Sequence, residues 1–173
     1  MSELLPLPRL TRGVLLSAVL LCAIMLAGCQ TPPPPAPHGL TDAQVAVLKQ
    51  QGFVDTDDGW TLGLSDKLLF ATDEDTLTPE SGRVVTRIGQ SLLAVGILRL
   101  RVLGYTDSAG SDGYNDALSE RRAIAVAAVL VSTGMAPGNV RQRGLGKRNP
   151  VADNRTEEGR AQNRRVAIVV EAE

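Results

Sequence analysis

The sequence has few of the residues that carry most enzymatic and metal chemistry. Its 173 residues include one histidine, His38, and two cysteines, Cys22 and Cys29, all near the beginning. A nucleophilic hydrolase needs a base beside its serine or cysteine, and a zinc site needs several histidine or cysteine ligands. The G-x-x-x-x-G-K-[ST] loop that holds nucleotide phosphates is also absent. We therefore expect no enzyme activity, no metal, no cofactor and no disulfide in the body of the chain.

Aromatic residues make up only 3% of the chain, so a hydrophobic core must be built from Leu, Val, Ile and Ala. The net charge of -1 gives no reason to expect a nucleic-acid partner. This total hides two opposite blocks: Thr41–Glu80 holds nine acidic and two basic residues, and Arg141–Arg165 holds eight basic and three acidic residues. Two interpretations stay open, because such blocks can be solvated surfaces or can steer a charged partner.

The beginning of the chain has the pattern of an export signal. A short basic segment precedes the uncharged apolar run Gly13–Leu26, which is shorter than the ~20 residues that a transmembrane helix needs. Ala27 and Gly28 then offer small residues to a peptidase, and the Cys29 thiol can accept a diacylglyceryl group. We predict that 1–28 is a lipoprotein signal peptide and that Cys29 becomes the acylated, palmitate-bearing N-terminus. The alternative is a retained anchor helix in which Cys29 is incidental.

The residues after Cys29 indicate where the protein is held and at what distance. Gln30 follows the cysteine, whereas an Asp at this position favours retention of bacterial lipoproteins in the inner membrane. We therefore expect a lipid-anchored protein of the outer membrane that faces the periplasm. Residues 29–40 include a proline run that favours polyproline II, with ~3.1 Å per residue. This stretch is predicted to be a semi-rigid spacer.

Residues 41–63 are predicted to form a helix followed by a hairpin arm. Thr41 is a suitable N-cap for a helix over Asp42–Gln51, and Gly52 ends it. Phe53–Leu64 has extended residues on both sides of a turn at Asp57-Asp58-Gly59, which is typical of a hairpin.

The remaining residues, 64–173, alternate strand and helix patterns and predict an α+β fold. The expected elements are a strand at Lys67–Phe70, a helix from Pro79, a strand with one buried face at Leu98–Tyr105, a helix at Tyr114–Thr133, a strand at Val140–Gly146, a short helix or turn at Thr156–Gln162 and a strand at Arg165–Val170. Right-handed crossovers favour a mixed four-stranded sheet with helices packed on one face. The expected buried stripes are Val84, Ile88, Leu92 and Val95 on the first helix, and Leu118, Ala125 and Val129 on the second.

One group of polar residues could bind a ligand. Asn115, Ser119 and Arg122 share a face of the second helix, and Asp107 lies in the loop that leads into it. A carboxylate and a guanidinium in one pocket suit a small zwitterion, since Asp107 would bind an ammonium and Arg122 a carboxylate. Asp107 and Arg122 could equally form an ion pair with each other. A glycan-cleaving carboxylate pair, Asp107 with Asp112, is a further alternative.

These residues belong to a longer pattern. Thr106–Ala123, TDSAGSDGYNDALSERRA, resembles the signature of the OmpA C-terminal domain family, which includes the peptidoglycan-associated lipoproteins, and Gly144–Gly146 and Asn163–Val166 resemble its later landmarks. The resemblance covers 64–170 and implies an OmpA-C-like β/α two-layer sandwich. It also implies that this domain binds peptidoglycan non-covalently through the free end of meso-diaminopimelate. The implied site residues are Asp107 and Arg122 as ligands, with Thr106, Gly110, Asn115, Leu118 and Arg165 shaping or lining the pocket. Tyr105 stands where many members have His, and we expect adjustment rather than loss of binding.

The segment before this domain has a resemblance of its own. Gly39–Phe53, Asp58–Trp60 and Val151–Asn154 are similar to the YfiB type of outer-membrane lipoprotein. That resemblance implies capture of a periplasmic repressor, which frees an inner-membrane diguanylate cyclase and raises cyclic di-GMP. Leu48, Phe53 and Trp60 would form the partner interface, because exposed apolar anchors suit an interface. In the alternative, these three residues fold back onto the domain's own sheet.

Three functions follow from this reading. The first is a wall-binding outer-membrane lipoprotein that signals by repressor capture, with peptidoglycan, membrane lipid at Cys29 and the repressor as partners. The second is a purely structural tether between the outer membrane and the wall, and the third is a wall hydrolase. The sequence leaves the oligomeric state open, a dimer included.

Overall fold

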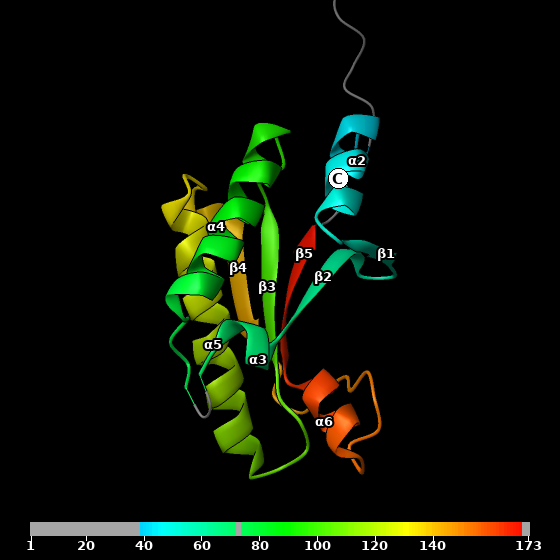
Figure 1. Ribbon diagram of the computed structural model, residues 1–173, viewed down its shortest axis with the longest axis vertical. Helices are drawn as coiled ribbons and strands as arrows, with labels where there is room; N and C mark the ends of the chain where they lie inside the picture. The colour runs from blue at the N-terminus through cyan, green and yellow to red at the C-terminus, as the bar shows by residue number, and fades with distance from the viewer. Residues whose placement is uncertain (1–38, 72–73, 171–173) are drawn as a thin grey trace, which may run out of the picture. The chain divides into compact units, whose positions relative to one another are not determined.

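Five strands form one sheet in the computed structural model, which describes residues 39–71 and 74–170. Their order across the sheet is β1 (Val54–Thr56), β2 (Gly59–Ser65), β5 (Arg165–Val170), β3 (Leu100–Tyr105) and β4 (Val140–Gly144) (Figure 1). β3 and β4 run parallel, and the other neighbouring pairs are antiparallel. The predicted fold class is confirmed, with one strand more than the four expected. The predicted signal peptide, Cys29 and most of the spacer lie outside the described residues.

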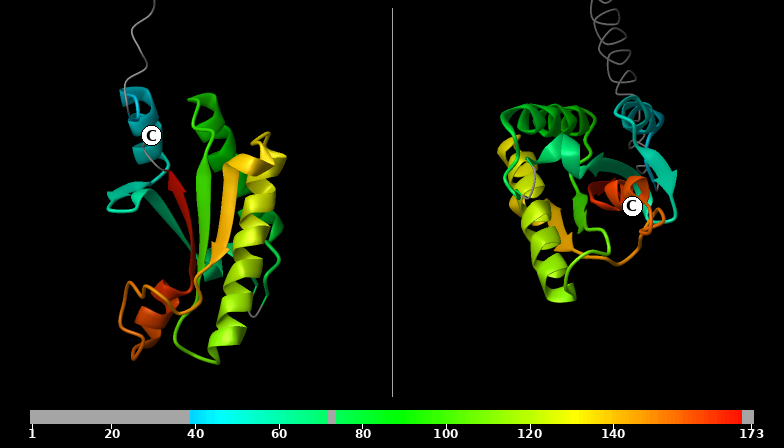
Figure 2. Two further views of the ribbon diagram at one scale, coloured as in Figure 1. Left: turned by 180° about the vertical axis from the view of Figure 1, so that it is seen from behind. Right: turned by 60° about the horizontal axis from the view of Figure 1, so that its bottom comes forward.

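Two long helices, α4 (Pro79–Ala94) and α5 (Asp112–Ser132), cover one face of this sheet. The described residues also form the shorter helices α2 (Asp42–Gln50), α3 (Asp66–Leu69) and α6 (Glu157–Asn163), and a 3-10 turn at Pro137–Asn139. α4 and α5 lie side by side over the sheet (Figures 1 and 2). Each begins after a hydroxyl side chain that accepts a backbone hydrogen bond, Thr78 for α4 and Ser111 for α5. Such caps satisfy N–H groups that the first turn of a helix leaves without partners.

Apolar side chains are buried on both faces of the sheet. The main core lies between the sheet and the two long helices and contains Val85, Leu92, Val102, Val126, Leu130 and Ile168. A smaller cluster, formed by Leu103, Tyr105, Ala167 and Val169, lies on the opposite face. The second half of β3 is therefore buried on both sides, whereas the sequence predicted one buried face. The cause is the register with β5, which places Leu103 beside Ala167.

The buried stripe of α5 also differs from the predicted one. The helix buries, along its length, Asn115, Ser119, Arg122, Ala123, Val126, Ala127 and Leu130. The expected stripe of Leu118, Ala125 and Val129 is only partly buried. On α4, Ile88 and Leu92 are buried as predicted, with Val85 in place of Val84. The prediction for α5 was wrong because it assumed that only apolar side chains face the sheet. The first half of this helix instead packs polar side chains inward.

Two strands of the sheet, β1 and β2, come from the predicted hairpin arm, and one of the four expected strands is absent. The hairpin forms with its turn at the expected place, and β2 pairs with β5 from Trp60 to Ser65. The domain boundary predicted after Gly63 therefore falls inside β2. The strand predicted at Lys67–Phe70 is wrong, because Ser65 and Asp66 begin the short helix α3 there. An acidic residue in the first turn favours such a helix start.

The three apolar residues of the arm fold back onto the domain. Leu48 and Phe53 are 0% and 3% exposed and belong to the main core. Trp60 packs half-buried against the same core, with the ammonium of Lys49 6.0 Å from its ring centroid. For Leu48 and Phe53 the structure therefore shows the folded-back alternative, and a partner interface at these residues stays a prediction. Pairing of β2 with β5 explains their burial, because it draws the hairpin and α2 onto the edge of the core.

Candidate functional site

A cavity of about 400 Å³ opens at the carboxyl end of β3. It lies between the loop after β3, the first half of α5 and α3. These three segments are found in the lower part of Figure 1. The predicted site residues that line it are Thr106, Asp107, Gly110, Asn115, Leu118 and Arg122. The structure therefore brings the predicted carboxylate and the predicted guanidinium to one hollow. It adds Asp66, Phe70 and Arg164, which the sequence did not predict.

Two glycines let α5 approach the sheet closely enough to form one wall of this cavity. A Cβ atom at Gly104 would overlap the carbonyl oxygen of Ser119, and one at Gly144 would overlap the backbone of Glu120. The Gly146 N–H donates to the Ser119 hydroxyl at 2.9 Å, and the Gly144 N–H donates to the Glu120 carboxylate. Ser119 and Glu120 of α5 therefore bond the carboxyl end of β4 and the turn after it, which explains the burial of the Ser119 hydroxyl.

The loop after β3 is held from several sides. The Asn115 amide of α5 donates to the carbonyl of Ala109 at 2.6 Å and to that of Ser111 at 3.1 Å. Gly110 has a φ of +82°, a left-handed conformation that favours glycine. The Lys147 ammonium donates to the Gly110 carbonyl at 3.0 Å. Asn115 and Gly110 thus shape the loop that carries Asp107 rather than supplying charge.

Asp107 lies in this loop with its carboxylate largely buried. Oδ1 accepts from the Ala109 N–H at 2.9 Å, and Oδ2 accepts from Nη1 of Arg164 at 2.7 Å. The hydrogen bond to Asp107 raises the pKa of the Arg164 guanidinium, although partial burial opposes this change. Glu157 also raises this pKa, with its Oε1 3.1 Å from Nη2 of Arg164. The Asp107–Arg122 ion pair considered from sequence is replaced by an Asp107–Arg164 pair.

Arg122 is held against the wall formed by α3 and the chain that follows it. Its Nε and Nη2 donate to the Glu74 carbonyl at 3.3 and 3.1 Å. Nη2 also lies 3.0 Å from Oδ1 of Asp66, and the guanidinium stands 5.1 Å from the Phe70 ring centroid. Only 4% of this arginine is exposed. A buried guanidinium with a fixed orientation can recognise a carboxylate specifically.

Arg165, which the resemblance placed at the pocket, lies elsewhere. Its guanidinium stacks 3.8 Å from the ring centroid of Tyr105, its partner across β3 and β5. Burial raises the pKa of Tyr105, with the charge of Arg165 opposing the change, and burial lowers the pKa of Arg165. Tyr105 and Arg165 therefore support the strand ends behind the pocket, and the neighbouring Arg164 provides the cation that lines it.

The sequence held signals for the residues that were missed. Two adjacent arginines, Arg164 and Arg165, lie where α6 ends and β5 begins. Successive side chains of an extended segment point in opposite directions, so the two were expected to face different sides of the sheet. Asp66 directly follows β2, at the same edge of the sheet where β5 begins. Finding it required the β2–β5 pairing, because the acidic residue is far from the signature motif in sequence.

The alternative carboxylate pair does not share the cavity. The Asp112 side chain is 89% exposed and lies 2.8 Å from the ammonium of Lys147, whose hydrogen bond lowers the pKa of this carboxyl. Asp107 faces Arg164 on the inner side of the loop. The charged side chains that line the cavity, Asp66, Asp107, Arg122 and Arg164, are suited to the recognition of charges. A close pair is worth up to ~4 kcal/mol at an effective dielectric constant of about 20, before desolvation is counted.

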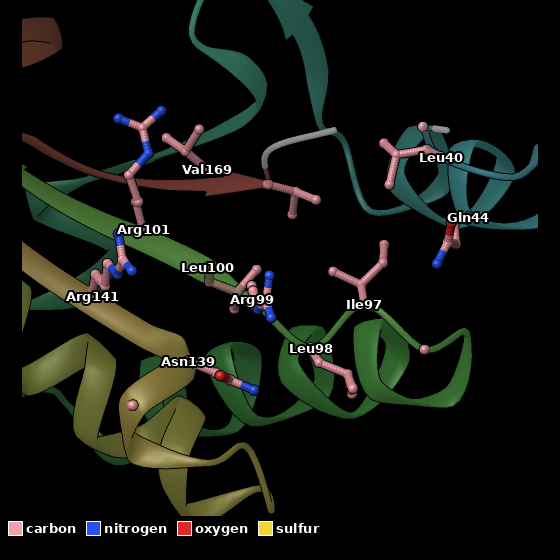
Figure 3. A pocket seen from close by; sticks show the side chains of 14 residues that line it. Leu40, Gln44, Ile97, Leu98, Arg99, Leu100, Arg101, Asn139, Arg141 and Val169 are labelled. Atoms are coloured by element: carbon pink, nitrogen blue, oxygen red, sulfur yellow. The ribbon is translucent and has the colours of Figure 1, made fainter. Parts of the chain in front are cut away.

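A larger cavity, of about 730 Å³, lies at the opposite end of β3. Figure 3 shows Arg99, Arg101 and Arg141 on one side of it, and Leu40 and Gln44 of the N-terminal segment on the other. Arg99 and Arg101 both have partners within the chain. Nη2 of Arg101 donates to the Asp58 carbonyl at 2.9 Å. None of the predicted pocket residues lines this cavity. We therefore place the candidate site at the smaller one.

Known proteins match both the sequence and the fold. Residues 69–164 match the OmpA family. The chain is 50% identical over 166 residues to the outer-membrane lipoprotein YfiB of Pseudomonas aeruginosa, covering 95% of this chain and 98% of that protein. It is 39% identical over 157 residues to the putative lipoprotein YfiB of Escherichia coli, covering 90% and 96%. The structure of the cell wall anchor of the T6SS from Pseudomonas aeruginosa matches with a TM-score of 0.62 and 33% identity, covering 76% of this chain and 95% of that one.

The similarity to these lipoproteins also gives the location. The protein is lipid-anchored in the outer membrane and faces the periplasm, as predicted. Among residues 39–71 and 74–170, no helix has the length and apolar character needed to cross a bilayer. The family match spans more than half of the chain, and the relatives cover nearly all of it, so the chain belongs to the OmpA family.

Proposed function

We propose that this protein binds peptidoglycan non-covalently through the free end of meso-diaminopimelate and so links the outer membrane to the wall. The observation that carries this proposal is that Asp107 and Arg122, two groups of opposite charge, line one small cavity. The free end of diaminopimelate carries an ammonium and a carboxylate on one carbon. The similarity to a protein described as a cell wall anchor supports the same assignment.

Each charged end of the ligand has a matching group. Asp107 receives the ammonium, because its carboxylate is already oriented by the Ala109 N–H. Arg122 receives the carboxylate, because its guanidinium is fixed by the Glu74 carbonyl and the Phe70 ring. Thr106, Gly110, Asn115 and Leu118 shape the cavity. Arg165 acts from behind the pocket, through its contact with Tyr105.

Binding of a purified muropeptide that contains meso-diaminopimelate tests this assignment. Asp107→Ala and Arg122→Ala should each weaken binding by roughly 30-fold or more, because truncating one partner of a buried charge pair costs about 2 kcal/mol or more. The matched control is Arg121→Ala, which removes the neighbouring exposed arginine that pairs with Asp75. Circular dichroism verifies that each variant is folded. A double variant that binds as the parent does contradicts the proposal, and cleavage of the muropeptide contradicts the absence of hydrolase activity.

We further propose that the protein sequesters a periplasmic repressor and so activates a membrane diguanylate cyclase. The 50% identity to YfiB over nearly the full length supports this second role. Trp60 is half-buried on the edge hairpin, and Val54 on the edge strand is 63% exposed. The β1–β2 register pairs Trp60 with Asp55 and Val54 with Thr61, so the two side chains lie on opposite faces of the hairpin. Each offers an apolar contact that is accessible without any rearrangement. Engagement of Leu48 and Phe53 requires release of α2 and the hairpin from the core.

Cyclic di-GMP in cells distinguishes this role from a purely structural tether. Trp60→Ala should reduce the nucleotide to the level of a strain that lacks the protein, while muropeptide binding is unchanged. Val151→Ala is the control, because Val151 is also an exposed apolar residue, 61% exposed, in the loop before α6. Unchanged cyclic di-GMP with Trp60→Ala and Val54→Ala leaves the tether as the function.

A further inference from the structure

Both charged groups of the proposed binding site are already paired with opposite charges from this chain. Arg122 contacts Asp66 at 3.0 Å, and Asp107 contacts Arg164 at 2.7 Å. Asp66 and Arg164 are themselves close, with Oδ2 of the first 4.0 Å from Nε of the second. The four side chains form an alternating row, Arg122, Asp66, Arg164 and Asp107. In this row Asp66 supplies a carboxylate to the arginine, and Arg164 supplies a cation to the aspartate.

We propose that Asp66 and Arg164 are internal competitors that a zwitterionic ligand displaces together, which makes the pocket selective for ligands with both charges. This inference rests on the proposed function. The ligand carboxylate replaces Asp66 on Arg122, and the ligand ammonium replaces Arg164 on Asp107. The two displaced side chains then pair with each other, because they already lie at 4.0 Å. Every charge keeps a partner, so the exchange avoids the high cost of an unpaired buried charge.

The backbone of both competitors is fixed, so only their side chains need to move. Ser65 and Arg165 are the last pair of the β2–β5 ladder, and the Asp66 N–H donates to the Arg164 carbonyl at 2.9 Å just beyond it. The Asp66 and Arg164 side chains are 18% and 23% exposed, compared with 5% for Arg122. The side chains of Asp66 and Arg164 are therefore in contact with water, whereas the side chain of Arg122 is almost completely buried.

The groups that contact the ligand keep their positions when the competitors leave. Arg122 remains bound to the Glu74 carbonyl and stacked on Phe70. Asp107 remains bound to the Ala109 N–H. Arg164 keeps Glu157, 3.1 Å from its Nη2. A ligand with only an ammonium displaces Arg164 but leaves Asp66 on Arg122, so it gains no contact with the guanidinium.

The affinity of the full-length protein for two stem peptides tests the inference. One peptide contains meso-diaminopimelate, and the other contains L-lysine at the same position. The lysine side chain ends in an ammonium without the carboxylate. Asp66→Asn keeps the shape of the side chain but removes its charge. If Asp66 holds Arg122 in about nine of ten molecules, this variant should bind the diaminopimelate peptide roughly tenfold more tightly. Its affinity for the lysine peptide should stay within about twofold of the parent.

A matched control separates this effect from a general change of charge. Asp75→Asn removes the same charge from an acidic residue that pairs with Arg121, the neighbour of Arg122. It should leave both affinities unchanged. Equal or weaker binding of the diaminopimelate peptide by Asp66→Asn overturns the inference. So does an equal gain for the lysine peptide, or an equal gain in the Asp75→Asn control.

A second variant tests the other competitor independently. Arg164→Gln should strengthen binding of the lysine peptide, because the Asp107 carboxylate no longer has to release a guanidinium. Weaker binding of both peptides would instead identify Arg164 as a direct ligand contact and overturn its role as a competitor. Failure of the proposed function looks different, since the parent protein would then bind neither peptide. Parent binding with no gain in either variant overturns only the inference.

Discussion

The Cα atom of Gly104 faces the carbonyl oxygen of Ser119 so closely that a side chain between them would overlap that oxygen. β3 and α5 meet at this contact, one residue before Tyr105 and two before the loop that carries Asp107. The distance between Asp107 on the loop and Arg122 on the helix therefore depends on a position without a side chain.

Gly104→Ala should destabilise the domain by about 1–3 kcal/mol, which is the typical cost of overpacking a rigid contact. Urea denaturation measures the free energy of unfolding. The matched control is Gly63→Ala on β2, where a Cβ meets no atom within 4 Å. Comparable losses in the two variants would show that the contact with α5 is not the cause.

Asn163→Ala should lower the free energy of unfolding by about 1–3 kcal/mol, because it leaves three part-buried backbone groups without their partner. The side chain is 0% exposed and accepts from the N–H groups of Val151 and Ala152 at 2.8 and 3.1 Å. It also donates to the Ala152 carbonyl and to Asn154, which in turn accepts from the Ser108 N–H beside Asp107. We therefore expect weaker muropeptide binding as well. Gln162→Ala, at the preceding exposed position, should change neither quantity.

Stability should fall as the pH rises through about 10, in part because of Tyr105. Burial raises the pKa of this phenol in the folded protein, so the folded state keeps a proton that the unfolded state has already lost. The contribution is fully present below the unfolded pKa and disappears as the pH rises through the folded one. Tyr105→Phe should show a smaller loss of stability between about pH 9 and 11 in urea denaturation. Tyr114→Phe, at an exposed tyrosine, should keep the parent slope, and identical slopes in all three proteins would contradict the prediction.

Cys29→Ser should release the protein from the outer membrane, because the acyl chains that hold it need the thiol. Several buried chains at ~0.8 kcal/mol per CH₂ make such an anchor effectively permanent. Fractionation of the cell envelope measures the location. Cys22→Ser is the control, since Cys22 lies inside the predicted signal peptide and is removed with it. Outer-membrane location of the Cys29→Ser protein would show that another feature anchors it.

Local sequence patterns predicted the elements that depend on near neighbours. The Thr41 side chain caps α2 and the Gln44 side chain completes the capping box, and the hairpin turns at the expected residues. β5 has the predicted bounds, Arg165–Val170. The hydrogen bonds that form these caps and turns join residues a few positions apart, so a single sequence contains the necessary information.

Contacts between distant residues were harder to predict. A strand was expected at Lys67–Phe70, because its apolar residues fit a strand, but α3 forms where β2 ends. The resemblance placed Arg165 at the pocket, but the arginine that lines the pocket is the preceding residue, Arg164. Successive side chains of a strand point to opposite faces, so a one-residue difference moves a charge to the other side of the sheet.

The sequence by itself determined the fold class and brought Asp107 and Arg122 into one candidate site, because the signature around them is contiguous and the helix periodicity is local. Only the tertiary structure decided which charges face these two residues. Asp66 and Arg164 lie far apart in the chain and meet through the register of β2 with β5. The same pairing buries Leu48 and Phe53, which the sequence left open to a partner. Long-range pairing depends on the packing of the whole core, which no short segment of the sequence specifies alone.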